Sequence, residues 1–132
     1  MKETFILNAR IYANNAIIDN GFIHIKGGVI ADVGNGSPLI SDTAAEVIDV
    51  GGRSVIPGFI DLQVNGAGGY LLTDLNTSHY DNITRSLARY GTTSFLVATS
   101  PCSNEEHRDI LNFVSNYLRN QISGSRVLGV HM

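Results

Sequence analysis

The residues best suited to chemistry stand directly after three short apolar segments of the chain. Gln63, Asn65 and Gly66 close the first segment, Thr99 follows the second, and His131 ends the third. Amide, hydroxyl and imidazole groups can each donate and accept hydrogen bonds, so this set suits the binding of a polar small molecule. An alternative stays open, in which Asn65 and Gly66 form only a turn and Gln63 is a satisfied buried amide.

Other reactive residue types carry weaker signals. Cys102 is the only cysteine and no histidine stands beside it in a recognisable motif, so we expect a small, partly buried side chain rather than a nucleophile. His24, His79 and His107 fall in a predicted strand and two predicted helices, and surface or packing roles are expected for them.

The elements that must position the candidate residues alternate between strand and helix. Residues 59–64, 92–98 and 127–130 read as strands, the first of them apolar enough for burial on both faces. Between them, Tyr80 and Ile83 begin an apolar stripe that ends before Gly91, and Ser103 with Glu106 forms a capping box for a second helix. This order predicts βαβ units around a parallel sheet.

A parallel sheet gathers the carboxyl ends of its strands at one edge, where ligands bind in such folds. We therefore expect Gln63, Asn65, Thr99 and His131 to face a common site. Side-chain alternation along a strand further predicts that Asp61, Gln63 and Asn65 point to the same side.

The first 55 residues predict a different structure, a small antiparallel β module. Candidate strands cover residues 5–7, 10–13, 22–26, 29–33 and 47–50. Tight turns that need positive φ are expected at Asn14-Asn15, Gly27-Gly28 and Gly51-Gly52, and residues 34–45 read as an exposed loop.

Residues 56–132 hold only three predicted strands, whereas a closed (β/α)₈ barrel needs eight strands and typically about 250 residues. We therefore expect a piece of a longer protein, with an uncovered strand edge and apolar surface that favour association. A small open sheet, complete as a stand-alone binding module, is the alternative.

Composition and charge narrow the classes of partner. With 43% hydrophobic and 16% charged residues the chain reads as a folded protein, and a net charge of −3 without a basic stripe argues against nucleic acid. No segment approaches the roughly 20 apolar residues of a membrane span, and no signal peptide is visible at the start. We expect a cytoplasmic protein that binds neither membrane nor nucleic acid.

Two motifs resemble a known family. Residues 57–69 read PGFIDLQVNGAGG and residues 128–132 read LGVHM. They are similar to the first-strand and third-strand motifs of the N-acetylglucosamine-6-phosphate deacetylases, members of the amidohydrolase superfamily. The resemblance implies an N-terminal part of such an enzyme, with residues 1–55 in a β-sandwich and residues 56–132 as the first units of an incomplete TIM barrel.

The resemblance also implies the chemistry. Many amidohydrolases carry His-x-His on the first strand, where this chain has Gln63 and Asn65, which points to a branch with a single divalent metal, zinc by expectation. The two amides would then hydrogen-bond the substrate or a metal-bound water, with Gly66, Thr99 and His131 nearby. The family's metal ligands and catalytic carboxylate fall outside this chain, so the chain alone is expected to bind no metal and to be inactive.

The implied substrate is an amino-sugar phosphate, and the implied assembly of the complete enzyme is a homodimer. A dihydroorotase-like or deaminase-like amidohydrolase is the alternative among enzymes, although these usually carry the His-x-His pair.

Overall fold

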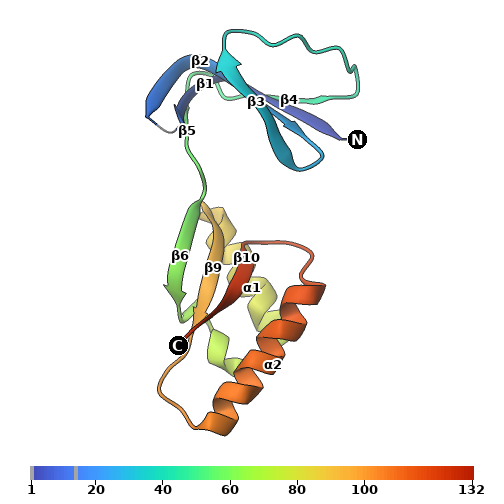
Figure 1. The fold of residues 1–132 in the computed structure, drawn as a ribbon. Helices are drawn as coiled ribbons and strands as arrows, with labels where there is room; N and C mark the ends of the chain where they lie inside the picture. The colour runs from blue at the N-terminus through green and yellow to red at the C-terminus, as the bar shows by residue number, and fades with distance from the viewer. Residues whose placement is uncertain (1, 14) are drawn as a thin grey trace. The chain divides into compact units, whose positions relative to one another are not determined.

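The computed structural model describes residues 2–13 and 15–132, and the chain divides into two compact units, Met1–Pro57 and Gly58–Met132. Each unit has its own cluster of buried apolar side chains. Figure 1 shows a β-rich first unit and a second unit in which helices accompany a small sheet, which is a mixed α/β organisation. Among the described residues, no helix is long and apolar enough to cross a membrane.

The first unit is a sheet of five strands in the order β3-β2-β1-β4, with β5 also paired to β1. The strands are β1 (Glu3–Ala13), β2 (Ala16–Lys26), β3 (Val29–Asn35), β4 (Glu46–Asp49) and β5 (Ser54–Val55). The prediction of a purely antiparallel module is wrong, because β4 and β5 run parallel to β1. The exposed loop after β3 returns the chain to the far side of β1, so β4 enters in the same direction as β1.

Residues 5–7 and 10–13, predicted as two strands, belong to the single strand β1. Asn8 between them adopts a left-handed φ of 54°, and the pairing of β1 with β2 shifts register between Ile6 and Ala9. The interruption in the sequence pattern is therefore a β-bulge within one strand, which bends it without ending it.

The glycine pairs differ in what they connect. Gly27 and Gly28 have φ of 61° and 83° and form the predicted tight turn between β2 and β3. Gly51 and Gly52 also have positive φ but join two strands that both run parallel to β1, so they are not a hairpin turn. The expected turn at Asn14-Asn15 includes Asn14, which lies outside the described residues.

The second unit has the predicted order of strand, helix, strand, helix and strand. Its main elements are β6 (Phe59–Val64), α1 (Thr77–Arg89), β9 (Thr92–Ala98), α2 (Asn104–Asn120) and β10 (Arg126–His131). The three strands form a parallel sheet in the order β10-β9-β6. Between β6 and α1, sequence reasoning missed β7 (Gly66–Ala67), β8 (Tyr70–Leu71) and the 3₁₀ turn η1 (Leu72–Asp74).

Local capping explains where the helices begin and end. The Asn76 side chain accepts hydrogen bonds from two amides in the first turn of α1, and Gly91, with φ of 87°, follows its last turn. At α2 the predicted capping box is confirmed, because the Glu106 carboxylate accepts from the Ser103 amide at 2.7 Å. This hydrogen bond lowers the pKa of Glu106.

One buried cluster joins both helices to the sheet. It contains Val64, Leu72, Tyr80, Ile83, Phe95, Val97, Ile110, Val114, Tyr117 and Val127. The prediction that residues 59–64 are buried on both faces is wrong, since Ile60 and Leu62 are 60% and 63% exposed and only Val64 in that strand is buried. The reason is that β6 is an edge strand of the sheet and that the helices cover one face only.

Candidate functional site

The carboxyl ends of β6, β9 and β10 lie along one edge of the sheet, because the three strands are parallel (Figure 1). Gln63 stands one residue before the end of β6 and Asn65 directly after it. Thr99 directly follows β9, and His131 is the last residue of β10. Four of the candidate residues therefore come from three neighbouring strand ends.

A bulge in β6 sets the direction of Gln63. Asp61 pairs with Phe95 and Val64 pairs with Val97, so two residues of β6 stand opposite a single residue of β9. The backbone amide of Gln63 donates to the side-chain carboxylate of Asp61 at 3.0 Å. Since Phe95 and Val97 both belong to the helix-side cluster, Asp61 and Val64 lie on that side, and Gln63 lies on the opposite face.

This placement corrects one prediction. Simple alternation expected Asp61, Gln63 and Asn65 on the same side, but the extra residue in the bulge separates Asp61 from the other two. Asn65 follows Val64 directly, so it and Gln63 share the face that the helices leave uncovered.

Thr99 and His131 are joined at the neighbouring strand ends. The Thr99 amide donates to the His131 carbonyl oxygen at 3.1 Å, and the Thr99 hydroxyl lies 3.4 Å from the same oxygen. His131 pairs with Ala98, one residue beyond the Val130–Val97 pair that contributes to the helix-side cluster. The imidazole therefore starts from the same open face as Gln63, and its side chain is exposed.

β9 separates the two groups of candidate residues. Neighbouring strands lie about 4.8 Å apart, so β6 and β10 are separated by roughly 10 Å across β9. The structure thus joins Thr99, at the end of β9, to the backbone of His131, and it places Gln63 and Asn65 across β9 from His131. Amide donors and an imidazole spaced in this way could contact opposite ends of a small polar molecule.

The short hairpin after β6 fixes Gly66. β7 and β8 pair through Gly66–Leu71 and Ala67–Tyr70, and the turn between them consists of Gly68 and Gly69. The alternative in which Asn65-Gly66 is only a turn is therefore wrong. Two-residue strands are too short to produce a periodic pattern, although the glycine pair after an apolar segment was a usable turn signal.

Two other histidines each pair with a carboxylate inside their own unit. Nδ1 of His79 lies 3.0 Å from the Asp74 carboxylate, and its ring packs on Tyr70 at 4.5 Å. In the first unit, Nε2 of His24 lies 2.9 Å from the Glu3 carboxylate. Sequence reasoning assigned packing or surface roles to both histidines but had no signal for their carboxylate partners, because these partners come from other elements.

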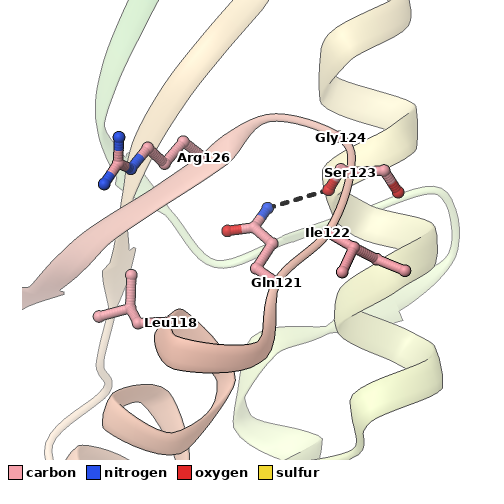
Figure 2. Close-up of a pocket in the computed structure, with 6 residues that line it drawn as sticks. All are labelled: Leu118, Gln121, Ile122, Ser123, Gly124 and Arg126. Atoms are coloured by element: carbon pink, nitrogen blue, oxygen red, sulfur yellow. Dashed lines mark hydrogen bonds between the residues drawn. The ribbon is translucent and has the colours of Figure 1, made fainter.

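One hollow of the second unit is shaped by a loop. It has a volume of about 290 Å³ and is lined by the loop from α2 to β10 (Figure 2). There the Gln121 amide donates to the carbonyl oxygens of Ser123 and Ser125 and accepts from the Val127 amide, so its side chain holds the loop. This loop lies at the amino end of β10, opposite the edge where ligands bind in parallel folds.

Cys102 is partly buried and packs against the apolar cluster of the second unit, as predicted. It also lines a smaller hollow of about 170 Å³ near the start of α2, with Thr73, Leu75, Ser100, Glu106, Asp109 and Ile110.

The residues at the strand edge do not by themselves suit a metal ion. Within residues 2–13 and 15–132, no group of three His, Cys, Asp or Glu side chains is gathered as a metal site would require. Gln63 and Asn65 offer neutral amide oxygens, which compete poorly with imidazole and carboxylate for zinc. His131 alone supplies one imidazole.

Known proteins resemble this chain along nearly all of its sequence, although no family model matches it. The chain is 29% identical over 140 residues to the N-acetylglucosamine-6-phosphate deacetylase of Bacillus subtilis (strain 168), covering 100% of this chain and 34% of the relative. The corresponding protein of Haemophilus influenzae is 28% identical over 131 residues, covering 96% of this chain and 34% of the relative.

The fold agrees with the sequence comparison. The crystal structure of N-acetylglucosamine-6-phosphate deacetylase from Pasteurella multocida superposes with a TM-score of 0.82 at 25% identity, covering 98% of this chain and 33% of that chain. The chain spans about a third of the length of the curated relatives it matches. By sequence and by fold, it is similar along its whole length to the N-terminal third of the N-acetylglucosamine-6-phosphate deacetylases.

Proposed function

We propose that this chain is part of an N-acetylglucosamine-6-phosphate deacetylase, which hydrolyses the acetamide of N-acetylglucosamine 6-phosphate to glucosamine 6-phosphate and acetate. The observation that carries the proposal is the similarity to two such deacetylases across nearly every residue of the chain. A dimeric assembly and a cytoplasmic location remain predictions.

Within that enzyme, residues 1–55 would belong to a β-sandwich and residues 56–132 would form the first strands of a (β/α)₈ barrel. The parallel order of β6, β9 and β10 supports this assignment. So does the exposed apolar face of the sheet, with Ile60, Leu62 and Leu128 between 48% and 63% exposed. In such a barrel the face away from the helices is the packed interior, so the remaining strands would cover these side chains.

The contribution of this chain would be to bind and orient the substrate. The amide groups of Gln63 and Asn65 can donate to the acetamide oxygen or a sugar hydroxyl, and the His131 imidazole can contact the far end of the molecule. A divalent metal, zinc by expectation, would polarise the acetamide carbonyl when bound. The residues that the structure describes gather no group of three metal-binding side chains, so the ligands of that metal would come from the rest of the complete enzyme.

The direct test uses the complete protein that contains this chain. Purified and supplied with zinc, it should release acetate and a free amine from N-acetylglucosamine 6-phosphate, whereas the 132-residue chain should not. Hydrolysis of another amide or an amidine, with none of this substrate, would reject the proposed substrate in favour of another amidohydrolase. Turnover by the isolated chain would contradict the view that its residues only bind and orient.

Replacing Gln63 by Ala separates binding from metal ligation. In the complete enzyme, loss of a hydrogen bond to developing charge should lower turnover about 10²-fold, with the bound metal unchanged. Asn116→Ala, which removes an exposed amide from α2, is the matched control and should be neutral. Loss of metal in the Gln63 variant would make Gln63 a ligand, and full activity would make it a structural residue only.

A further inference from the structure

We propose that Tyr80 is a positioning residue for Asn65, acting through the backbone of Leu72. The inference rests on the proposed function, in which Asn65 contacts the substrate. Tyr80 itself lies on α1 and belongs to the buried cluster.

Two hydrogen bonds connect the tyrosine to the candidate site. The Tyr80 hydroxyl donates to the Leu72 carbonyl oxygen at 2.8 Å. The Leu72 amide donates to the Asn65 carbonyl oxygen at 2.9 Å. Both polar groups of one residue, Leu72, are therefore engaged, one towards the helix and one towards the site.

Burial makes this connection specific. Tyr80 and Leu72 are both 0% exposed, so water cannot replace the tyrosine hydroxyl without opening the core. Removing that hydroxyl would leave the Leu72 carbonyl without its donor, and the backbone would shift to recover one. Because Leu72 also holds Asn65, the shift would move the Asn65 side chain relative to the substrate.

A second tyrosine provides the contrast. Tyr117, on α2, packs on Tyr80 with ring centroids 5.0 Å apart, and its hydroxyl donates to the Asp81 carboxylate at 2.7 Å. It shares the aromatic cluster and has a hydroxyl hydrogen bond of its own, but that bond ends on α1 and not on η1, where Leu72 lies. Packing alone would make the two tyrosines equivalent.

A second contact from α1 limits the expected effect. His79 binds the Asp74 carboxylate at the end of η1, so the segment stays attached at that point when the Tyr80 hydroxyl is removed. We therefore expect Tyr80→Phe to displace Asn65 partially. The loss of turnover should be about 10-fold, smaller than the roughly 10²-fold expected for removal of the Asn65 amide itself.

The test is a double-mutant cycle in the complete enzyme, with Tyr117→Phe as the control. Tyr80→Phe should lower kcat about 10-fold in the wild-type background and less than about 2-fold in the Asn65→Ala background, because it acts only through Asn65. Tyr117→Phe should leave kcat within about 2-fold in both backgrounds. An equal loss from Tyr80→Phe in both backgrounds, or equal losses from the two tyrosine variants, would overturn the proposal.

Amide exchange on the 132-residue chain distinguishes this failure from failure of the proposed function. Tyr80→Phe should accelerate exchange of the Leu72 amide about 10-fold relative to the Val97 amide in the sheet, and Tyr117→Phe should not. If the complete wild-type protein lacks deacetylase activity, the proposed function fails, and with it the catalytic meaning of the connection. If the enzyme is active and Leu72 exchange is unchanged, only the positioning role fails.

Discussion

Replacing Gly66 by Ala should distort the hairpin that follows β6, because the added Cβ atom would collide with the backbone of the neighbouring strand β8. A Cβ atom built on Gly66 lies 2.2 Å from the carbonyl oxygen of Tyr70, whereas real Cβ atoms essentially never approach closer than 3.0 Å. The oxygen belongs to the backbone of β8, so the clash cannot be relieved by a rotamer change. The two short strands must separate by about 1 Å.

The cost follows from that separation. Overpacking in a well-packed site typically costs about 1–3 kcal/mol, and a ladder hydrogen bond stretched by that much loses about 1 kcal/mol of net stabilisation. We expect Gly66→Ala to lower the free energy of unfolding of the second unit by about 2 kcal/mol. Urea titration followed by amide resonances of residues 58–132 would measure it.

Gly69 in the same hairpin is the matched control. Its φ is 87° and no atom lies within 4 Å of the position that a Cβ atom would take, so only its left-handed backbone requires glycine. Asn tolerates that conformation, and Gly69→Asn should change the free energy of unfolding by less than about 1 kcal/mol. If Gly66→Ala is as mild as Gly69→Asn, β7 and β8 do not require glycine at position 66 for their close approach.

Three further results are expected. Asn76→Ala removes the cap of α1 and should cost about 1 kcal/mol in urea unfolding, whereas Asn116→Ala, within α2, should leave stability unchanged or slightly raised because Ala has the higher helix propensity. Ser125→Ala leaves the Thr92 carbonyl without its hydroxyl donor and should cost about 1–3 kcal/mol, and a neutral result would show that water reaches this site. Burial raises the pKa of Tyr117 to about 12, above the roughly 10 of an unfolded tyrosine, so its contribution to stability is complete below about pH 10 and is lost as pH rises towards 12. Unfolding measured across that interval should show a shallower decline in Tyr117→Phe, and an equal decline would refute the assignment.

Local sequence rules succeeded where local interactions decide the structure. The side chains of Ser103 and Glu106 each accept a hydrogen bond from the other residue's backbone amide. The start of α2 therefore needs no distant contact and could be predicted. The end of α1 at Gly91 is determined in the same way.

The failures came from pairing partners that the sequence pattern does not reveal. The burial of residues 59–64 depends on what lies beside β6 and over the open face of its sheet, which apolar composition cannot show. The parallel direction of β4 depends on the path of the preceding loop. At the candidate site, the ends of three strands were predicted, but the pairing of Asp61 with Phe95 required the register.

The bulge in β6 makes the length of this strand a sensitive variable in its own right. The side chain of Leu62 is exposed in this chain, so a substitution there that keeps an apolar side chain should leave the pairing of β6 with β9 intact. Deleting Leu62 would instead restore regular pairing with β9, with Gln63 as the single residue between Asp61 and Val64. It would also remove the two-residue spacing at which the Asp61 carboxylate accepts a hydrogen bond from the Gln63 backbone amide. Libraries that vary this strand should therefore hold its length fixed, because an insertion or deletion changes the register of β6 against β9, which a substitution does not.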